Sequence, residues 1–169
     1  MNGTTRIFPF LISKNLNNPF SSFCFMNTKA KGSKGERELI HFFNQNGWSA
    51  IRAAGSGSQR YPSPDILAGN AMRRIAIECK VTADTKKYLL NEEIEQLRTF
   101  ATKFGAEGWI GVRFPSEPWY FLMLEDIENT GKCWAVSLEL AKRRGLKMEE
   151  LLGVSELQKN KEKPLDRNV

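Results

Sequence analysis

The sequence has few of the residues that build disulfide frameworks, zinc sites and histidine-based active sites. Its 169 residues include three widely separated cysteines and a single histidine, His41. No Cys-x-x-Cys pair or Cys/His cluster is present, so neither a disulfide framework nor a structural zinc site is indicated, and we expect a reducing, cytoplasmic location. A Ser-His-Asp or two-histidine metal mechanism would depend entirely on His41, which argues against both classes.

Long apolar runs are also lacking. The apolar run at residues 7–12 is too short to span a bilayer, so no membrane partner is expected. Residues 1–28 show no helical or strand period, and we expect a leader that is disordered or precedes a native start of translation at Met26. Residues 29–153 are then expected to form one domain, and residues 154–169 a basic, flexible tail. The formal net charge of +6 favours polyanionic partners without choosing between DNA, RNA and membrane.

Two apolar runs at residues 66–69 and 75–81 predict a β-hairpin, because Gly69-Asn70 marks a turn between them. Successive side chains of a strand alternate between its two faces. Glu78 and Lys80 therefore share one face of the second strand, and Asp65, at the start of the first strand, can meet them across the hairpin. Two acids and a lysine on one sheet face suit a hard divalent cation beside an attacking water. The plainer interpretation is a solvated ion pair between Glu78 and Lys80.

Segments on both sides of the hairpin supply further candidates. A helix is predicted over residues 31–46, with Ser33 as its N-cap and Glu36 three residues later, as in a capping box. Glu36 either caps this helix or projects toward the sheet near the two acids. After a predicted strand at residues 48–53, the loop side chains of Ser56, Ser58 and Arg60 can donate to phosphates, unless the loop is a plain Gly/Ser linker.

The rest of the chain predicts an α/β layout around one mixed sheet flanked by helices. A second helix is expected over residues 92–104, capped by Asn91 and carrying acids in its first turn. Strands at residues 109–114 and 119–124 and a basic, helix-prone tail from Leu138 follow. Phe100 and Phe104 share the apolar face of the second helix, which by spacing alone indicates core.

The acid after a proline, followed by Glu-x-Lys, resembles the motif of the PD-(D/E)xK nuclease superfamily. A closer resemblance, to the archaeal Holliday junction resolvases, rests on several segments in the family order, at residues 31–39, 52–56, 64–70, 77–82 and 151–153. It implies a restriction-endonuclease-like core and a homodimer. It also implies a metal-dependent endonuclease that binds four-way DNA junctions and cuts two strands symmetrically.

The resemblance also implies roles for individual residues. It gives the acidic metal-site positions to Glu36, Asp65 and Glu78, the catalytic lysine to Lys80 and a catalytic-loop position to Ser56. The implied cofactor is Mg²⁺ or Mn²⁺, with the Cys79 carbonyl as a further ligand. DNA contacts are expected from Lys31, Lys34, Arg37, Arg52, Ser58 and Arg60, and a dimer interface from Phe100 and Phe104. The loop before Asp65 is longer than in the shortest members, so the serine can be Ser56 or Ser58.

Two other functions remain open on the sequence. A restriction-like or repair nuclease of the same superfamily would share every acid and differ only in its DNA substrate. A non-catalytic DNA-binding module would keep the basic residues, although the intact set of Asp65, Glu78 and Lys80 argues against it. An RNA-binding protein is less favoured, because no aromatic RNA-recognition motif is found.

Overall fold

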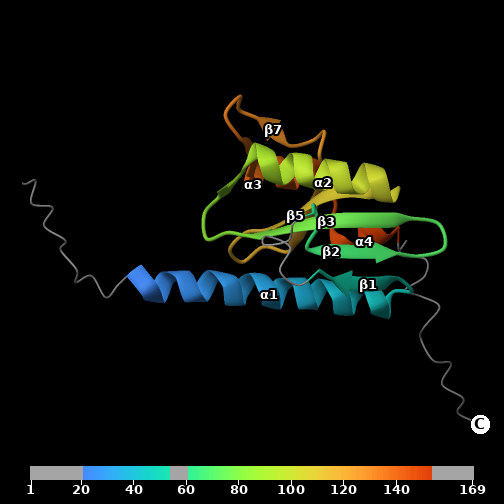
Figure 1. The fold of residues 1–169 in the computed structure, drawn as a ribbon. Helices are drawn as coiled ribbons and strands as arrows, with labels where there is room; N and C mark the ends of the chain where they lie inside the picture. The colour runs from blue at the N-terminus through green and yellow to red at the C-terminus, as the bar shows by residue number, and fades with distance from the viewer. Residues whose placement is uncertain (1–20, 54–60, 154–169) are drawn as a thin grey trace, which may run out of the picture.

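The computed structural model describes residues 21–53 and 61–153, with side chains from residue 33 onward. Within these ranges the chain forms a mixed α/β structure (Figure 1). No helix in the described ranges has the length and apolar character needed to cross a membrane. The elements are α1 (Ser21–Gln45), β1 (Ser49–Arg52), β2 (Ile66–Gly69), β3 (Arg74–Val81), β4 (Lys86–Leu89), α2 (Asn91–Phe104), β5 (Glu107–Arg113), β6 (Trp119–Met123), β7 (Glu128–Asn129), β8 (Trp134–Ser137), α3 (Leu138–Arg144) and α4 (Met148–Leu152).

The central sheet has five strands in the order β1-β2-β3-β5-β6. β3 and β5 run parallel and the other neighbouring pairs are antiparallel, which confirms the predicted mixed sheet. A parallel pair needs a crossover connection, and α2 lies in the segment between β3 and β5. A second, three-stranded sheet in the order β4-β8-β7 was not predicted.

The predicted hairpin is present as β2 and β3, paired in an antiparallel register that places Ile66 opposite Ile77. Asn70 closes the turn between the strands. Its backbone N–H donates to the carbonyl of Arg73 at 2.9 Å, and its side-chain oxygen accepts the Arg73 N–H at 2.8 Å. An asparagine turn of this kind fixes the register of the hairpin, and the register fixes which side chains share a face.

Helices cover both faces of the central sheet, with α1 on one face and α2 on the other (Figure 1). Leu39 and Phe43 of α1 belong to the same buried cluster as Ile75 and Ile77 of β3. Ala76, between these two isoleucines, belongs instead to the cluster beneath α2. The alternation predicted for β3 is therefore confirmed, and the even-numbered face that carries Glu78 and Lys80 is the face toward α2.

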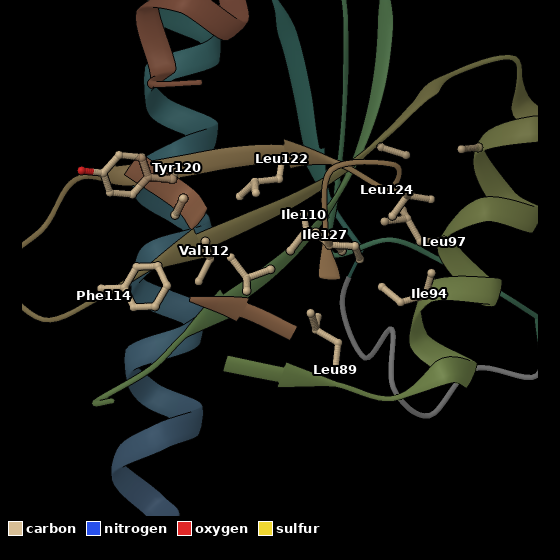
Figure 2. Packing of buried hydrophobic residues seen from close by; sticks show 14 residues of the cluster. Leu89, Ile94, Leu97, Ile110, Val112, Phe114, Tyr120, Leu122, Leu124 and Ile127 are labelled. Carbon is tan, nitrogen blue, oxygen red and sulfur yellow. The ribbon is translucent and has the colours of Figure 1, made fainter. Parts of the chain in front are cut away.

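The cluster beneath α2 fixes that helix against the sheet. Ile94 and Leu97 point from α2 toward Ile110 of β5 and Leu124 after β6 (Figure 2). All four side chains are at most 5% exposed. Burying side chains of this size contributes roughly 1.5–3 kcal/mol each, so the first turns of α2 are held firmly over β3 and β5.

The predicted start of the first helix is wrong. α1 begins at Ser21, so Ser33 lies inside the helix and is not its N-cap. The Ser33 hydroxyl accepts a hydrogen bond from Arg52 at 3.3 Å instead. Residues 21–28, predicted as part of a disordered leader, are helical, whereas residues 1–20 and the predicted tail at 154–169 lie outside the described residues.

Candidate active site

The hairpin brings together the predicted acids of its two strands. Asp65 directly precedes β2, and Glu78 lies within β3. One carboxylate oxygen of Asp65 accepts the backbone N–H of Cys79 at 2.8 Å, which ties the start of β2 to β3 beside Glu78. The Asp65 charge is also close enough to Glu78 to contribute to its pKa. The convergence expected from the register is therefore observed.

Lys80 lies between two carboxylates. Its ammonium donates to Glu78 Oε1 at 2.7 Å and to Glu93 Oε1 at 2.6 Å. The exposed fractions of the side chains are 16% for Lys80, 17% for Glu78 and 31% for Glu93. The solvated ion pair considered for Glu78 and Lys80 is thus not what forms, because both side chains are largely withdrawn from water and a third charge joins them.

Two carboxylates share the one ammonium of Lys80, and the pKa values of Glu78 and Lys80 are both shifted from their ordinary values. Burial, only partly offset by the Lys80 charge, raises the pKa of Glu78 to about 7, with Asp65 adding to the rise. Burial would lower the pKa of Lys80, but Glu78 and Glu93 outweigh it and raise that pKa above its ordinary value. Lys80 is therefore an ammonium at neutral pH, suited to donate hydrogen bonds and stabilise negative charge, while Glu78 lacks a full counter-charge.

Glu36 faces the sheet, as one of its two interpretations required. Its carboxylate forms an ion pair with Arg52 of β1, and only 13% of the side chain is exposed. The alternative role as a helix cap is wrong, because α1 begins well before it. Burial raises the pKa of the Cys79 thiol, and the charges of Asp65, Glu36 and Glu78 raise it further, so all three acids lie around Cys79.

The carboxylates of Glu36, Asp65 and Glu78 are the candidate ligands for a divalent cation. No group of three or more His, Cys, Asp or Glu side chains is arranged as metal ligands within the described residues, so Glu36, Asp65 and Glu78 do not form one ligand set there. Mg²⁺ generally takes only one or two protein carboxylates and completes its shell with water and substrate phosphates. The carboxylates of Asp65 and Glu78, the latter with a raised pKa that a nearby cation would lower, fit this requirement.

The predicted DNA contacts are only partly described. Lys34 and Arg37 are exposed on α1, and Arg52 keeps 32% of its side chain exposed despite its bond to Glu36. The side chain of Lys31 lies outside the described residues. So do the loop residues Ser56, Ser58 and Arg60, and their roles, including the choice of serine, stay predictions.

Phe100 and Phe104, the predicted dimer contacts, stack on each other along α2. Their ring centroids are 5.4 Å apart and their planes differ by 12°. Phe100 packs on the core beneath α2, whereas Phe104 is 48% exposed. The pair lines a depression of about 240 Å³ together with Tyr61 and Pro62. The two residues therefore differ, since Phe100 contributes to the core and Phe104 presents an aromatic surface.

Sequence reasoning missed Glu93 as a site residue. The sequence alone explains the acids at the start of α2 as favourable charges for a helix N-terminus. The prediction of Asn91 as the cap is wrong, because the helix begins at Asn91 and Leu90 precedes it. A usable signal was present. Glu93 lies four residues before Leu97, on the buried face of α2, and that face packs on the side of β3 that carries Lys80.

The mixed sheet with helices on both faces, and the two acids and lysine on its hairpin, define a nuclease of the restriction-endonuclease-like fold. The model of the family "Archaeal holliday junction resolvase (hjc)" matches residues 27–160. The chain belongs to the archaeal Holliday junction resolvase family.

Individual relatives agree with this assignment. The crossover junction endodeoxyribonuclease Hjc of Archaeoglobus fulgidus is 39% identical over 125 residues, which cover 74% of this chain and 91% of the relative. The protein of the same name from Sulfurisphaera tokodaii is 34% identical over 73% of this chain and 87% of its own length. The solved structure of the Archaeoglobus fulgidus protein, described as a Holliday junction resolvase, superposes with a TM-score of 0.67 at 38% identity. It covers 71% of this chain and 97% of that one.

Proposed function

We propose that this protein is an endonuclease that resolves four-way DNA junctions by metal-dependent hydrolysis of phosphodiester bonds. The observation that carries the proposal is the convergence of Asp65, Glu78 and Lys80 on the β2–β3 hairpin, in a chain of this family. The relatives named above are crossover junction endodeoxyribonucleases, which supports a four-way junction as the substrate.

The chemistry can be assigned to the residues of the hairpin. Asp65 and Glu78, with the Cys79 carbonyl, would hold Mg²⁺ or Mn²⁺, which supplies charge neutralisation at the phosphate and a more acidic water. Lys80, as an ammonium, would orient the attacking water and stabilise the charge that develops on the phosphate. Glu36 would act on the cation only indirectly, because its carboxylate forms an ion pair with Arg52.

Substrate binding would use the exposed basic residues and a second copy of the chain. Lys34 and Arg37 are exposed on α1, and Arg52 of β1 is bonded to Glu36, so their ammonium and guanidinium groups would be available to contact phosphates. A homodimer with two-fold symmetry would set two identical sites at a fixed separation, as paired incisions in a near-symmetric junction require. The exposed ring of Phe104 supports α2 as part of the dimer contact.

Cleavage of a labelled junction tests the proposal. The full-length protein is incubated with Mg²⁺ and a four-way junction labelled in turn on each strand, with a chelator in the matched control. We expect paired cuts at symmetric positions, and we expect unlabelled junction to compete far better than linear duplex of equal length. Equal competition by duplex would favour a restriction-like or repair nuclease. Binding without any metal-dependent cut would favour a non-catalytic module.

The dimer is tested separately by sedimentation of the Phe104→Ser protein. Tyr88→Ser serves as the matched control, because Tyr88 is a second exposed aromatic side chain, 58% exposed, on β4. We expect a folded monomer with weak junction binding for Phe104→Ser and a dimer for Tyr88→Ser. A fully dimeric, active Phe104→Ser protein would contradict this use of α2.

A further inference from the structure

Glu93 is bonded through both of its carboxylate oxygens to different parts of the chain. Oε2 accepts the backbone N–H of Leu90, the residue before α2, at 2.7 Å. Oε1 accepts the Lys80 ammonium at 2.6 Å, across from α2 to β3. One short side chain therefore closes the N-terminus of the helix and reaches the lysine proposed to act on the phosphate.

The helix N-terminus alone does not require the second of these bonds. α4 begins in the same way, since Glu150, the third residue of that helix, accepts the backbone N–H of Lys147 at 2.7 Å. Glu150 is exposed, and among the described residues no lysine or arginine side chain bonds to it. The same capping bond is thus made by Glu150 with one oxygen and by Glu93 with one oxygen, and the Lys80 contact of Glu93 is additional.

The additional contact matters because Glu78, the other partner of Lys80, has a competing use. Glu78 Oε1 accepts the Lys80 ammonium at 2.7 Å, yet the same carboxylate is one of the two that would hold the divalent cation. A dication competes with an ammonium for a carboxylate oxygen, since its charge is larger. A largely buried ammonium that lost its partner would be costly, so a second carboxylate is needed to hold Lys80 in place.

We propose that Glu93 is a positioning residue, which fixes the Lys80 ammonium beside the hairpin acids and so leaves Glu78 available to the divalent cation. The inference rests on the proposed function for the part of Lys80 in the reaction, whereas the contact itself is observed between described side chains. Glu93 is supported by the core beneath α2, where Ile94 and Leu97 are buried, so its position is set by a rigid element.

The test compares Glu93→Gln with Glu150→Gln in full-length, metal-free protein. Glutamine is neutral and offers one carbonyl oxygen in place of the two carboxylate oxygens that Glu93 uses, so its contact with Lys80 is no longer an ion pair. The readout is the ¹H–¹⁵N NMR signal of the Lys80 side-chain ammonium, assigned by its loss in Lys80→Gln. We expect slow proton exchange in the wild type and in Glu150→Gln. In Glu93→Gln we expect exchange faster by about 10- to 100-fold, from the loss of one hydrogen bond between charged groups.

Cleavage gives a second readout on the same proteins. Under single-turnover conditions with Mg²⁺ and junction, we expect Glu93→Gln to cut about 10- to 100-fold more slowly with unchanged junction affinity, and Glu150→Gln to cut at the wild-type rate. If Glu93→Gln does not fold, Glu93→Asp replaces it. Aspartate keeps a carboxylate in the first turn of the helix but is one methylene too short to reach Lys80, so the same losses are expected.

Distinct outcomes would overturn the inference. Unchanged exchange of the Lys80 ammonium in the folded Glu93 variant would show that Glu78 alone orders the lysine. Equal slowing of cleavage by Glu150→Gln would assign the effect to helix capping. A wild-type protein that cuts no junction would refute the proposed function, while the metal-free NMR comparison would still decide whether Glu93 positions Lys80.

Discussion

The two ends of β3 carry the same kinds of charged residue in opposite arrangements. Directly before its first residue, Arg73 donates to both carboxylate oxygens of Glu107, at 2.9 and 2.7 Å, and to the carbonyl of Leu151 at 2.8 Å. Trp109 adds a fourth hydrogen bond, from its indole N–H to Glu107 at 3.2 Å. One cation meets one anion, and the pair joins the hairpin, β5 and α4.

Toward its other end, β3 places several acids around one lysine. Glu78 and Glu93 both bond to the single Lys80 ammonium, and Asp65 lies close to Glu78, so the two carboxylates that share Lys80 lack a full counter-charge. The pKa of Glu107 is lowered by its hydrogen bonds from Arg73, whereas the pKa of Glu78 is raised to about 7 by burial. A balanced pair holds the fold together, while buried acids in excess are stabilised only when a further cation arrives.

The largest effect is expected from removing the carboxylate of Glu78 or Asp65. Glu78→Gln or Asp65→Asn should slow junction cleavage on the order of a thousandfold or more, because the cation contributes several kcal/mol to the transition state. Junction binding should remain, since neither acid is placed to contact DNA favourably. The measurement is single-turnover cleavage beside a binding titration, with Glu107→Gln as the control from the other end of β3. Cleavage by either variant at the wild-type rate would remove the proposed metal site.

A smaller effect, on stability and not on cleavage, is expected from the Arg73–Glu107 pair. Arg73→Gln should lower the free energy of unfolding by about 1–3 kcal/mol, because it breaks hydrogen bonds to a charged group that is partly exposed. The cleavage rate per folded molecule should not change. Urea denaturation followed by circular dichroism measures the first quantity. A stable Arg73→Gln protein with impaired cleavage would contradict the assignment of the Arg73–Glu107 pair to stability alone.

A pH dependence of opposite sign is expected at the two ends of β3, in chelator-treated protein. The pKa of Glu107 is below its ordinary 4.5, so its stabilisation is present above pH 4.5 and is lost as the pH falls through the lowered value. The pKa of Glu78 is raised from 4.5 to about 7, so the stability linked to it is present below pH 4.5 and is lost as the pH rises through about 7.

Urea denaturation of the wild type, Glu107→Gln and Glu78→Gln across this pH range checks the prediction. The stability advantage of the wild type over Glu78→Gln should shrink from about pH 4.5 to about pH 7, and its advantage over Glu107→Gln should shrink only below about pH 4.5. Two difference curves with the same slope would mean that the two carboxyl groups share one environment.

The sequence predicted those parts of the molecule that local pattern determines. Strand alternation and the turn at Gly69-Asn70 fix the register of the hairpin, and the register alone brings Asp65 to Glu78. The start of α1 was mispredicted, because the spacing of Ser33 and Glu36 imitates a capping box while both side chains actually bond to Arg52. That contact joins positions distant in sequence, so no local pattern reveals it.

Two further features escaped prediction for related reasons. β7 has two residues, which is too short for alternation to identify a strand, and β8 pairs with β4, which is distant in sequence, so the second sheet was missed. Glu93 carried a local signal as a first-turn acid, but its bond to Lys80 depends on how α2 packs across β3. The hairpin chemistry was thus predictable, whereas the residue that holds its lysine required the packing of the helix.

The most direct test of the account is the position of a bound cation. Crystals of the wild type soaked with Mn²⁺ should give an anomalous difference peak between the carboxylates of Asp65 and Glu78, and crystals of Glu78→Gln should give none there. A peak in the wild type at another group of acids, or equal peaks in both proteins, would contradict the assignment of this end of β3 as the metal site.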